Sequence, residues 1–172
     1  SRVPSCDFVV APDVIDGSEA ENDDLLSACP LPVSVVAPVW HMHESVDRLV
    51  RLVRQYPRVC LGSSGAFAAV GTADWWARMA DAMSAVCDSK GRPLSKLHGL
   101  RMLNPKIFSR LPLASADSTN IARNIGIDSG WRGTYLPATK EARALVMRGR
   151  IEDVNSAPTW GAKEQQCFFP LF

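Results

Sequence analysis

Short, valine-rich apolar runs that alternate with helical patterns are the feature that most restricts the fold of this chain. Each run ends in turn or capping residues, and most are followed by apolar side chains every three or four positions. Strands separated by helices are parallel, because each helical crossover returns the chain in the same direction. We therefore predict an α/β fold. The five runs are residues 6–13, 31–40, 58–65, 95–102 and 111–118.

Helix boundaries are indicated by capping residues. Ser18 and Glu21 make a capping-box pattern that predicts a helix to about Cys29. Asn104 followed by Pro105 predicts another helix start, and a last helix is expected over about 139–148. Two further helices are predicted from apolar stripes, which we expect to face the core: Val46, Leu49, Val50 and Val53 in one, and Trp75, Trp76, Met79, Met83 and Val86 in the other.

The strands read as near-continuous apolar segments, which is typical of a parallel sheet covered on both faces. Such sheets occur in barrels and in doubly wound folds. A closed (β/α) barrel has eight strands and roughly 250 residues, whereas this chain has 172 residues. We expect one domain over 1–172, a TIM-barrel-like repeat that is incomplete or short, with an irregular tail over about 151–172. An open sheet is the alternative.

Composition excludes several classes of protein. No apolar run approaches the ~20 residues of a membrane span, and the N-terminal segment lacks the apolar region of a signal peptide. We therefore expect a cytoplasmic protein that does not bind membranes. The cysteines lack the C-x-x-C pairs of zinc or redox sites, so we expect buried free thiols. They are Cys6, Cys29, Cys60, Cys87 and Cys167.

Charge is distributed unevenly along the chain. Residues 1–90 carry 7 basic and 12 acidic side chains, and residues 91–172 carry 12 basic and 6 acidic ones. The C-terminal half therefore has a net charge of about +6, which is compatible both with a polyanionic partner and with an ordinary solvated surface.

Polar residues follow directly on the predicted strands. In both candidate architectures the carboxyl ends of parallel strands meet at one edge, where active sites form. We therefore expect these residues to converge on one site: Asp13, Trp40, His41, His43, Gly62, Ser63, Ser64, His98, Gly99 and Asp117.

The segment "LHGLRMLNPKIFSRLPLASADSTNIARN" resembles the part of tRNA-guanine transglycosylases that carries the nucleophilic aspartate. Asp117 stands at the nucleophile's position, and Ala122-Arg123-Asn124 match the end of the signature that follows it. "FVVAPDVIDG" is similar to the strand whose acid recognises guanine, which points to Asp13. "VCLGSSGAF" is similar to the loop that lies against the base, and "APVWHMH" has Trp40 and His41 where the family has a glutamine. The family's zinc motif is absent from this sequence.

The compact form is similar to the phage and bacterial branch that inserts 7-deazaguanines into DNA. The resemblance implies a retaining base exchange in which Asp117 is the nucleophile and Asp13 reads the base. It implies no metal and no other cofactor, and its partners would be DNA or tRNA and a free 7-deazapurine base. A homodimer is also expected. The strands missing from the barrel could lie upstream or come from a partner. The substrate-binding residues would be Trp40, His41, Gly62, Ser63, His98, Gly99, Ser118, Asn120 and Arg123.

Two further contacts are expected from a nucleic-acid substrate. A base that leaves its stack needs an aromatic platform, for which Trp40 and Phe67 are candidates. Basic side chains would hold the phosphates without reading the sequence. The candidates are Arg101, Lys106, Arg110, Arg123 and Arg132.

The same residues are compatible with three other functions. With water as the acceptor, the site would be that of a DNA glycosylase that hydrolyses the glycosidic bond. His41-Met42-His43 resembles the metal site of amidohydrolases, and His98 and Asp117 could complete a ligand set for zinc. A third alternative is a relative that binds bases or nucleic acid without catalysis.

Overall fold

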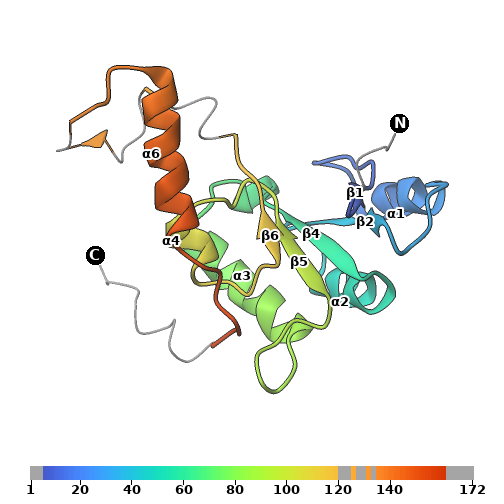
Figure 1. Ribbon diagram of the computed structural model, residues 1–172. Helices are drawn as coiled ribbons and strands as arrows, with labels where there is room; N and C mark the ends of the chain where they lie inside the picture. The colour runs from blue at the N-terminus through green and yellow to red at the C-terminus, as the bar shows by residue number, and fades with distance from the viewer. Residues whose placement is uncertain (1–5, 120–124, 127–130, 133–134, 162–172) are drawn as a thin grey trace.

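The computed structural model describes residues 6–119, 125–126, 131–132 and 135–161, and its elements alternate between strands and helices. It confirms the α/β class (Figure 1). In chain order the elements are β1 (Val9–Val10), α1 (Glu19–Ser27), β2 (Val36–Ala37), β3 (Val39–His41), α2 (Val46–Gln55), β4 (Arg58–Gly62), the 3-10 helix η1 (Gly65–Phe67), α3 (Ala73–Val86), β5 (Lys96–Gly99), α4 (Pro105–Phe108), β6 (Ser115–Ala116) and α6 (Lys140–Glu152).

All strand pairs are parallel, and neighbours in the sheets follow the order of the chain. β1 pairs with β2, and a second sheet has the order β3-β4-β5-β6. Only Pro38 separates β2 from β3. The carbonyl of Ala37 accepts from the Ala11 N–H on one side, and the carbonyl of Pro38 accepts from the Cys60 N–H on the other. β1 and β4 therefore flank one continuous segment, interrupted where proline has no N–H to donate.

Helix starts agree with the sequence prediction. Ser18 caps α1 in a capping box with Glu21, and Asn104 caps the short helix α4 at Pro105. α6 begins after the cap Thr139 and continues to Glu152, so it extends two residues into the tail that we predicted to be irregular.

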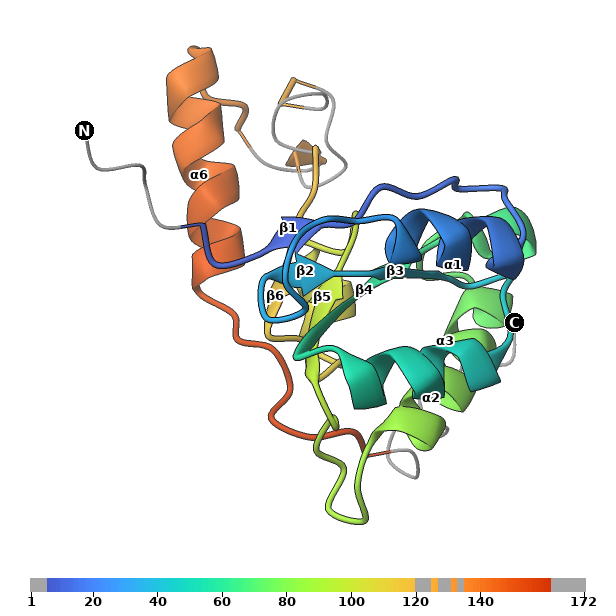
Figure 2. The same cartoon turned by 90° about the vertical axis from the view of Figure 1, so that its right-hand side faces the viewer.

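One face of the sheets carries the main hydrophobic core, and we call it the helix-covered face. Side chains from α1, α2, α3 and α4 all join the cluster built on Trp40, Leu61 and Leu97, and Figure 2 shows α2 and α3 lying together against this side. The predicted stripe of α3 is buried throughout, with Trp75 against Trp76 in an edge-to-face pair at 4.8 Å. In α2 the stripe differs from the prediction: the buried residues are Arg48, Leu49, Leu52 and Val53.

The opposite face carries a row of residues in register across four strands: Val39, Cys60, His98 and Ser115. We call it the open face. Its small cluster of Ala37, Val39 and Cys60 is covered by Phe8 and Leu100, neither of which belongs to a helix.

The described strands do not close into a barrel, because the sheet ends at β1 and β6. Val9 and Val10 on the β1 edge are 40% and 37% exposed. Among the described residues, no helix combines the length and apolar character needed to cross a membrane.

Candidate functional site at the carboxyl ends of the strands

Asp117 follows β6 and is held by its neighbours. Its Oδ1 accepts from the backbone N–H of Arg101 at 2.7 Å, and His98 Nε2 lies 3.4 Å from its Oδ2. Arg101 adopts a φ of 62°, a left-handed conformation that is strained for a residue with a side chain. The Asp117 side chain is nonetheless 55% exposed. A carboxylate that is both oriented and accessible is suited to attack or to stabilise a positive centre.

His98 connects Asp117 to the rest of the open face. Its Nδ1 lies 2.8 Å from Ser115 Oγ, which also accepts from Arg58 at 3.0 Å. The Arg58 guanidinium lies over the Phe8 ring at 4.1 Å, and the same ring contacts His98. A polar chain thus runs across three strands beneath the N-terminal segment.

A second carboxylate–histidine pair lies at the ends of β1 and β3. Asp13 Oδ2 is 2.8 Å from Nε2 of His41, and the imidazole is buried. This close contact lacks the alignment of a hydrogen bond, and neither ring nitrogen has a hydrogen-bond partner among the described residues. A Cβ on Gly62 would stand 3.1 Å from His41 Nδ1, so a glycine at this position gives the ring its space.

The loop after His41 is fixed by a buried ion pair that the sequence analysis missed. Glu44 accepts from the backbone N–H of His41 and from Arg48, and Arg48 also reaches Asp23 and the carbonyl of Val39. Asn22 donates to the other Glu44 oxygen. The acid-then-base spacing of Glu44 and Arg48 could have suggested a pair on a helix surface, but only the fold shows that both side chains are buried.

Cys60 lies between the two carboxylate–histidine pairs. Burial raises the pKa of its thiol to about 12; Arg58 opposes the shift, and the negative charges of Asp117 and Asp13 add to it. Both carboxylates therefore lie close enough to this buried atom to act on its charge. The thiol itself is protonated at neutral pH and is not a nucleophile.

Three of the predicted site residues serve the helix-covered face instead. Trp40 is fully buried in the core and donates to the carbonyl of Ser45, so the prediction that it contacts a substrate is wrong. Ser63 accepts from the indole N–H of Trp75. A Cβ on Gly99 would lie 2.8 Å from Met102 Cβ, so this glycine permits close packing of the core.

The remaining substrate-binding predictions divide into two groups. Ser118 follows Asp117 and is partly buried. Asn120 and Arg123 lie outside the described residues. Phe67, the other aromatic candidate, is partly buried against the core, with the Arg78 guanidinium 5.7 Å from its ring.

His43 is engaged in a way that conflicts with the hypothetical metal set. Its Nε2 faces the carbonyl of Gly17 at 3.0 Å and must donate to it, so its Nδ1 accepts from Ser64 at 2.8 Å. No lone pair of this ring is left for a metal. Over the part of the chain that the structure describes, no group of three or more His, Cys, Asp or Glu side chains is arranged to hold a metal ion.

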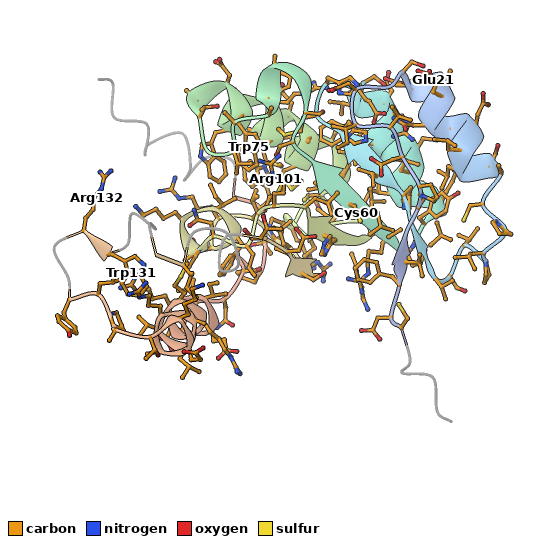
Figure 3. All side chains as sticks on the ribbon, turned by 90° about the horizontal axis from the view of Figure 1, so that it is seen from above. Glu21, Cys60, Trp75, Arg101, Trp131 and Arg132 are labelled. Carbon is orange, nitrogen blue, oxygen red and sulfur yellow. The ribbon has the colours of Figure 1, made fainter. Side chains whose placement is uncertain are left out.

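The candidate phosphate-binding residues are only partly gathered. Arg101 is exposed beside Asp117, whereas Arg110 lies over the Trp76 ring at 5.6 Å. Lys106 is exposed on α4. Arg132 extends outward from the segment beside α6 (Figure 3), and Arg123 lies outside the described residues.

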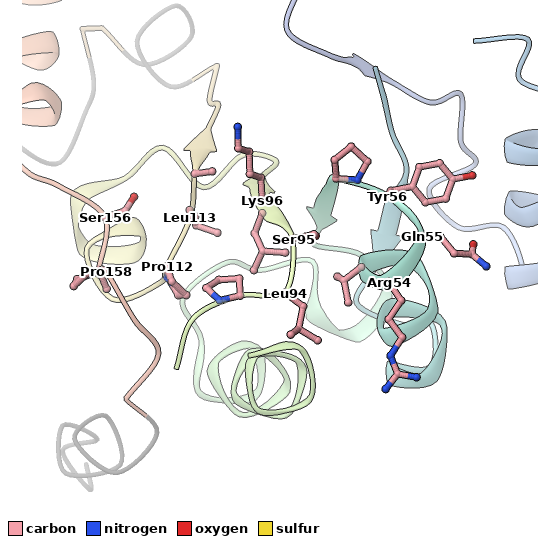
Figure 4. A pocket seen from close by; sticks show the side chains of 16 residues that line it. Arg54, Gln55, Tyr56, Leu94, Ser95, Lys96, Pro112, Leu113, Ser156 and Pro158 are labelled. Atoms are coloured by element: carbon pink, nitrogen blue, oxygen red, sulfur yellow. The ribbon is translucent and has the colours of Figure 1, made fainter. Parts of the chain in front are cut away.

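A large groove lies away from these groups. It measures ≈ 920 Å³, and its walls include Tyr56, Leu94 and Lys96 (Figure 4). These residues precede or begin β4 and β5, so the groove borders the amino ends of the strands. In parallel α/β sheets and barrels the chemistry belongs to the carboxyl ends, and we place the candidate site there.

Known proteins offer no direct comparison. No protein-family model, no curated protein and no solved structure matches the chain.

Proposed function

We propose that this protein exchanges a base in nucleic acid, replacing guanine in DNA with a 7-deazaguanine through a covalent bond between Asp117 and the sugar. The observation that carries the proposal is the state of Asp117: it is held by Arg101 and His98, yet more than half exposed at the end of a parallel strand. The proposal rests equally on the sequence resemblance to transglycosylases.

The chemistry can be written with atoms and charges balanced. An Asp117 oxygen attacks the sugar C1′ while the bond from C1′ to the base breaks, and the departing base keeps the electron pair and takes up a proton. The incoming base then attacks C1′, loses its ring N–H proton and releases the carboxylate. Two displacements retain the configuration at C1′.

Asp13 is the candidate for reading the base edge. It is partly exposed, and its partner His41 is buried and fixed by the Glu44 network. Because Trp40 faces the core, Val39 and His41 face the substrate side of this strand, and His41 is the polar one of the two. A carboxylate there can accept from the N1 and amino hydrogens of guanine.

The proposed architecture is a (β/α) barrel that is incomplete in this chain. Strands in sequential parallel order, with the helices packed on the opposite side from Asp117, support it. The face that carries Asp117 would then be the barrel interior, which a second copy or a further segment would close. The nucleic-acid backbone would contact exposed basic residues such as Arg101 and Lys106.

Hydrolytic removal of a base is the second candidate, and the exposure of Asp117 favours it. A carboxylate that is 55% exposed leaves room for water to resolve the covalent intermediate. The metal-dependent hydrolase has weaker support, because both nitrogens of His43 are engaged.

The test is incorporation of labelled guanine into duplex DNA and, in parallel, into bulk tRNA. We expect label in DNA with the wild type and none with Asp117→Asn. Asp24→Asn, an exposed acid on α1, is the matched control and should keep the wild-type rate.

Each outcome has a defined meaning. Label in tRNA would change the acceptor. Release of free base without incorporation would indicate the glycosylase. An Asp117→Asn protein as active as wild type, or no reaction of either kind, would exclude Asp117 as the nucleophile of a base exchange.

A further inference from the structure

A chain of polar contacts ends at Asp117, and its members come from successive strands. Arg58 from β4 donates to Ser115 of β6 at 3.0 Å, Ser115 lies 2.8 Å from His98 Nδ1 of β5, and His98 Nε2 lies 3.4 Å from Asp117. His98 is 7% exposed, so water has little access to the ring. The proton on this ring is therefore set by protein groups.

The acceptor at Asp117 indicates where that proton is. An ionised carboxylate can only accept, so the His98 Nε2 that faces Asp117 at 3.4 Å is expected to carry a hydrogen. Ser115 Oγ accepts from Arg58 and still has its hydroxyl proton, which the unprotonated Nδ1 of a neutral ring accepts at 2.8 Å. The neutral imidazole then carries its own hydrogen on Nε2, which faces the Asp117 carboxylate.

We propose that Ser115 is a positioning residue that fixes His98 in the Nε2–H tautomer and thereby directs a hydrogen bond at Asp117. The functional part of this inference rests on the proposed role of Asp117 as nucleophile. The tautomer itself does not depend on that role.

The consequence for Asp117 is that each of its oxygens faces a donor. Oδ1 accepts from the Arg101 N–H, and Oδ2 is offered the His98 N–H. Two donors fix the orientation of the carboxylate. Other charged groups also act on this region: Arg58 lies on the far side of Ser115, and both Asp117 and Asp13 act on Cys60. Removing the Ser115 hydroxyl should therefore alter the orientation of the Asp117 carboxylate and leave the fold unchanged.

Nitrogen-15 NMR of the histidine rings tests the tautomer without any assay of activity. We expect the wild type to show Nδ1 of His98 as the unprotonated nitrogen and Nε2 as the protonated one. His43 is an internal reference, because the Gly17 carbonyl requires the same tautomer there. His98→Gln assigns the signals by removing one set.

Two variants of Ser115 form the matched pair. Ser115→Ala removes the hydroxyl and should give a mixture of tautomers at His98, whereas Ser115→Thr keeps the hydroxyl and should retain the wild-type pattern. Protonation of His98 at Nδ1 in the wild type, or an unchanged pattern in Ser115→Ala, would overturn the proposal.

The kinetic readout separates this inference from the proposed function. With Ser115→Ala we expect kcat for base exchange or release to fall about tenfold or more, with little change in KM, and Ser115→Thr to restore it. A tautomer change without any loss of kcat would show that Ser115 sets the ring but not the reaction. A wild type with no activity would refute the proposed function alone, because the NMR result would still decide the tautomer.

Discussion

The two faces of the sheet are built from alternate residues of the same strands, yet they are covered differently. Trp40 and Leu61 point to the helix-covered face, where side chains from several helices exclude water from a large apolar cluster. Their strand neighbours Val39 and Cys60 point to the open face, where Phe8 and Leu100 are the apolar side chains that cover them among the described residues. The alternation of side chains along a strand thus separates the large apolar core from the polar side chains of the candidate site.

The difference teaches where to look for function. A parallel sheet is normally apolar on both faces, and burying a polar side chain is costly unless it is paired. The open face nevertheless carries His41 and His98, each with a carboxylate nearby. Polar groups kept at that cost are candidates for chemistry, whereas substitutions on the helix-covered face should act on stability.

The largest effect on stability is expected from Trp75→Ala. The ring is fully buried and packs edge-to-face on Trp76, so its removal leaves a cavity and should lower the free energy of unfolding by about 3 to 5 kcal/mol. Urea denaturation followed by circular dichroism measures this change. Leu145→Ala on α6, where the side chain is 65% exposed, is the control and should cost less than about 0.5 kcal/mol. Similar losses in both variants would contradict the assignment of the core.

Gly99→Ala should have an intermediate effect. The new Cβ would stand 2.8 Å from Met102 Cβ and 2.9 Å from Leu113 Cδ1, and such overpacking typically costs about 1 to 3 kcal/mol. Gly149→Ala is the matched control, because a Cβ there meets nothing within 4 Å and alanine in a helix is favoured by roughly 0.5 to 1 kcal/mol. The same urea titration should therefore move in opposite directions for the two variants. An unchanged free energy of unfolding in Gly99→Ala would contradict this close packing around Gly99.

Asp117→Asn should change stability only slightly. The side chain is 55% exposed and its contact with His98 is long at 3.4 Å, and polar contacts of exposed side chains contribute about 0 to 1 kcal/mol. The amide oxygen of asparagine can still accept from the Arg101 N–H. We expect a midpoint of thermal unfolding close to that of the wild type. A loss above about 2 kcal/mol would give any loss of activity a structural explanation and would weaken the contrast between the faces.

Local patterns were sufficient to predict the class of fold. The sequence alone correctly predicted features that depend on contacts within a single helix. They are the capping box of Ser18 and Glu21 in α1, the Asn104–Pro105 start of α4 and the apolar stripe of α3. Strand lengths were less predictable: β1 and β6 are only two residues long, because a strand extends only as far as its partner continues.

The candidate site was predictable in part. Asp13, His41, His98 and Asp117 could be found because each lies at the carboxyl end of a strand or shortly beyond it. The side of the sheet to which Trp40 points could not be predicted. An uninterrupted apolar run has no alternation of polar and apolar residues that would assign each residue to one face or the other. Ser115 and Arg58 were missed for a related reason: their contacts join strands that are distant in the sequence.

The smallest change is expected at Cys60, which tests the cover of the open face. Burial raises the pKa of its thiol from 9.0 to about 12. Since only the thiolate reacts, a rise of this size lowers the reactive fraction at mildly alkaline pH by about a thousandfold. Below pH 9.0 the raised pKa does not change the free energy of unfolding. The protein loses stability only as the pH rises from 9.0 towards 12, because the thiol of the unfolded chain loses its proton first.

We expect iodoacetamide, followed by mass spectrometry of the peptides, to modify exposed Cys6 in the native protein and to modify Cys60 only after unfolding in urea. Rapid modification of native Cys60 would mean that Phe8 leaves the open face readily. The two faces would then differ in how often they open to solvent as well as in what covers them.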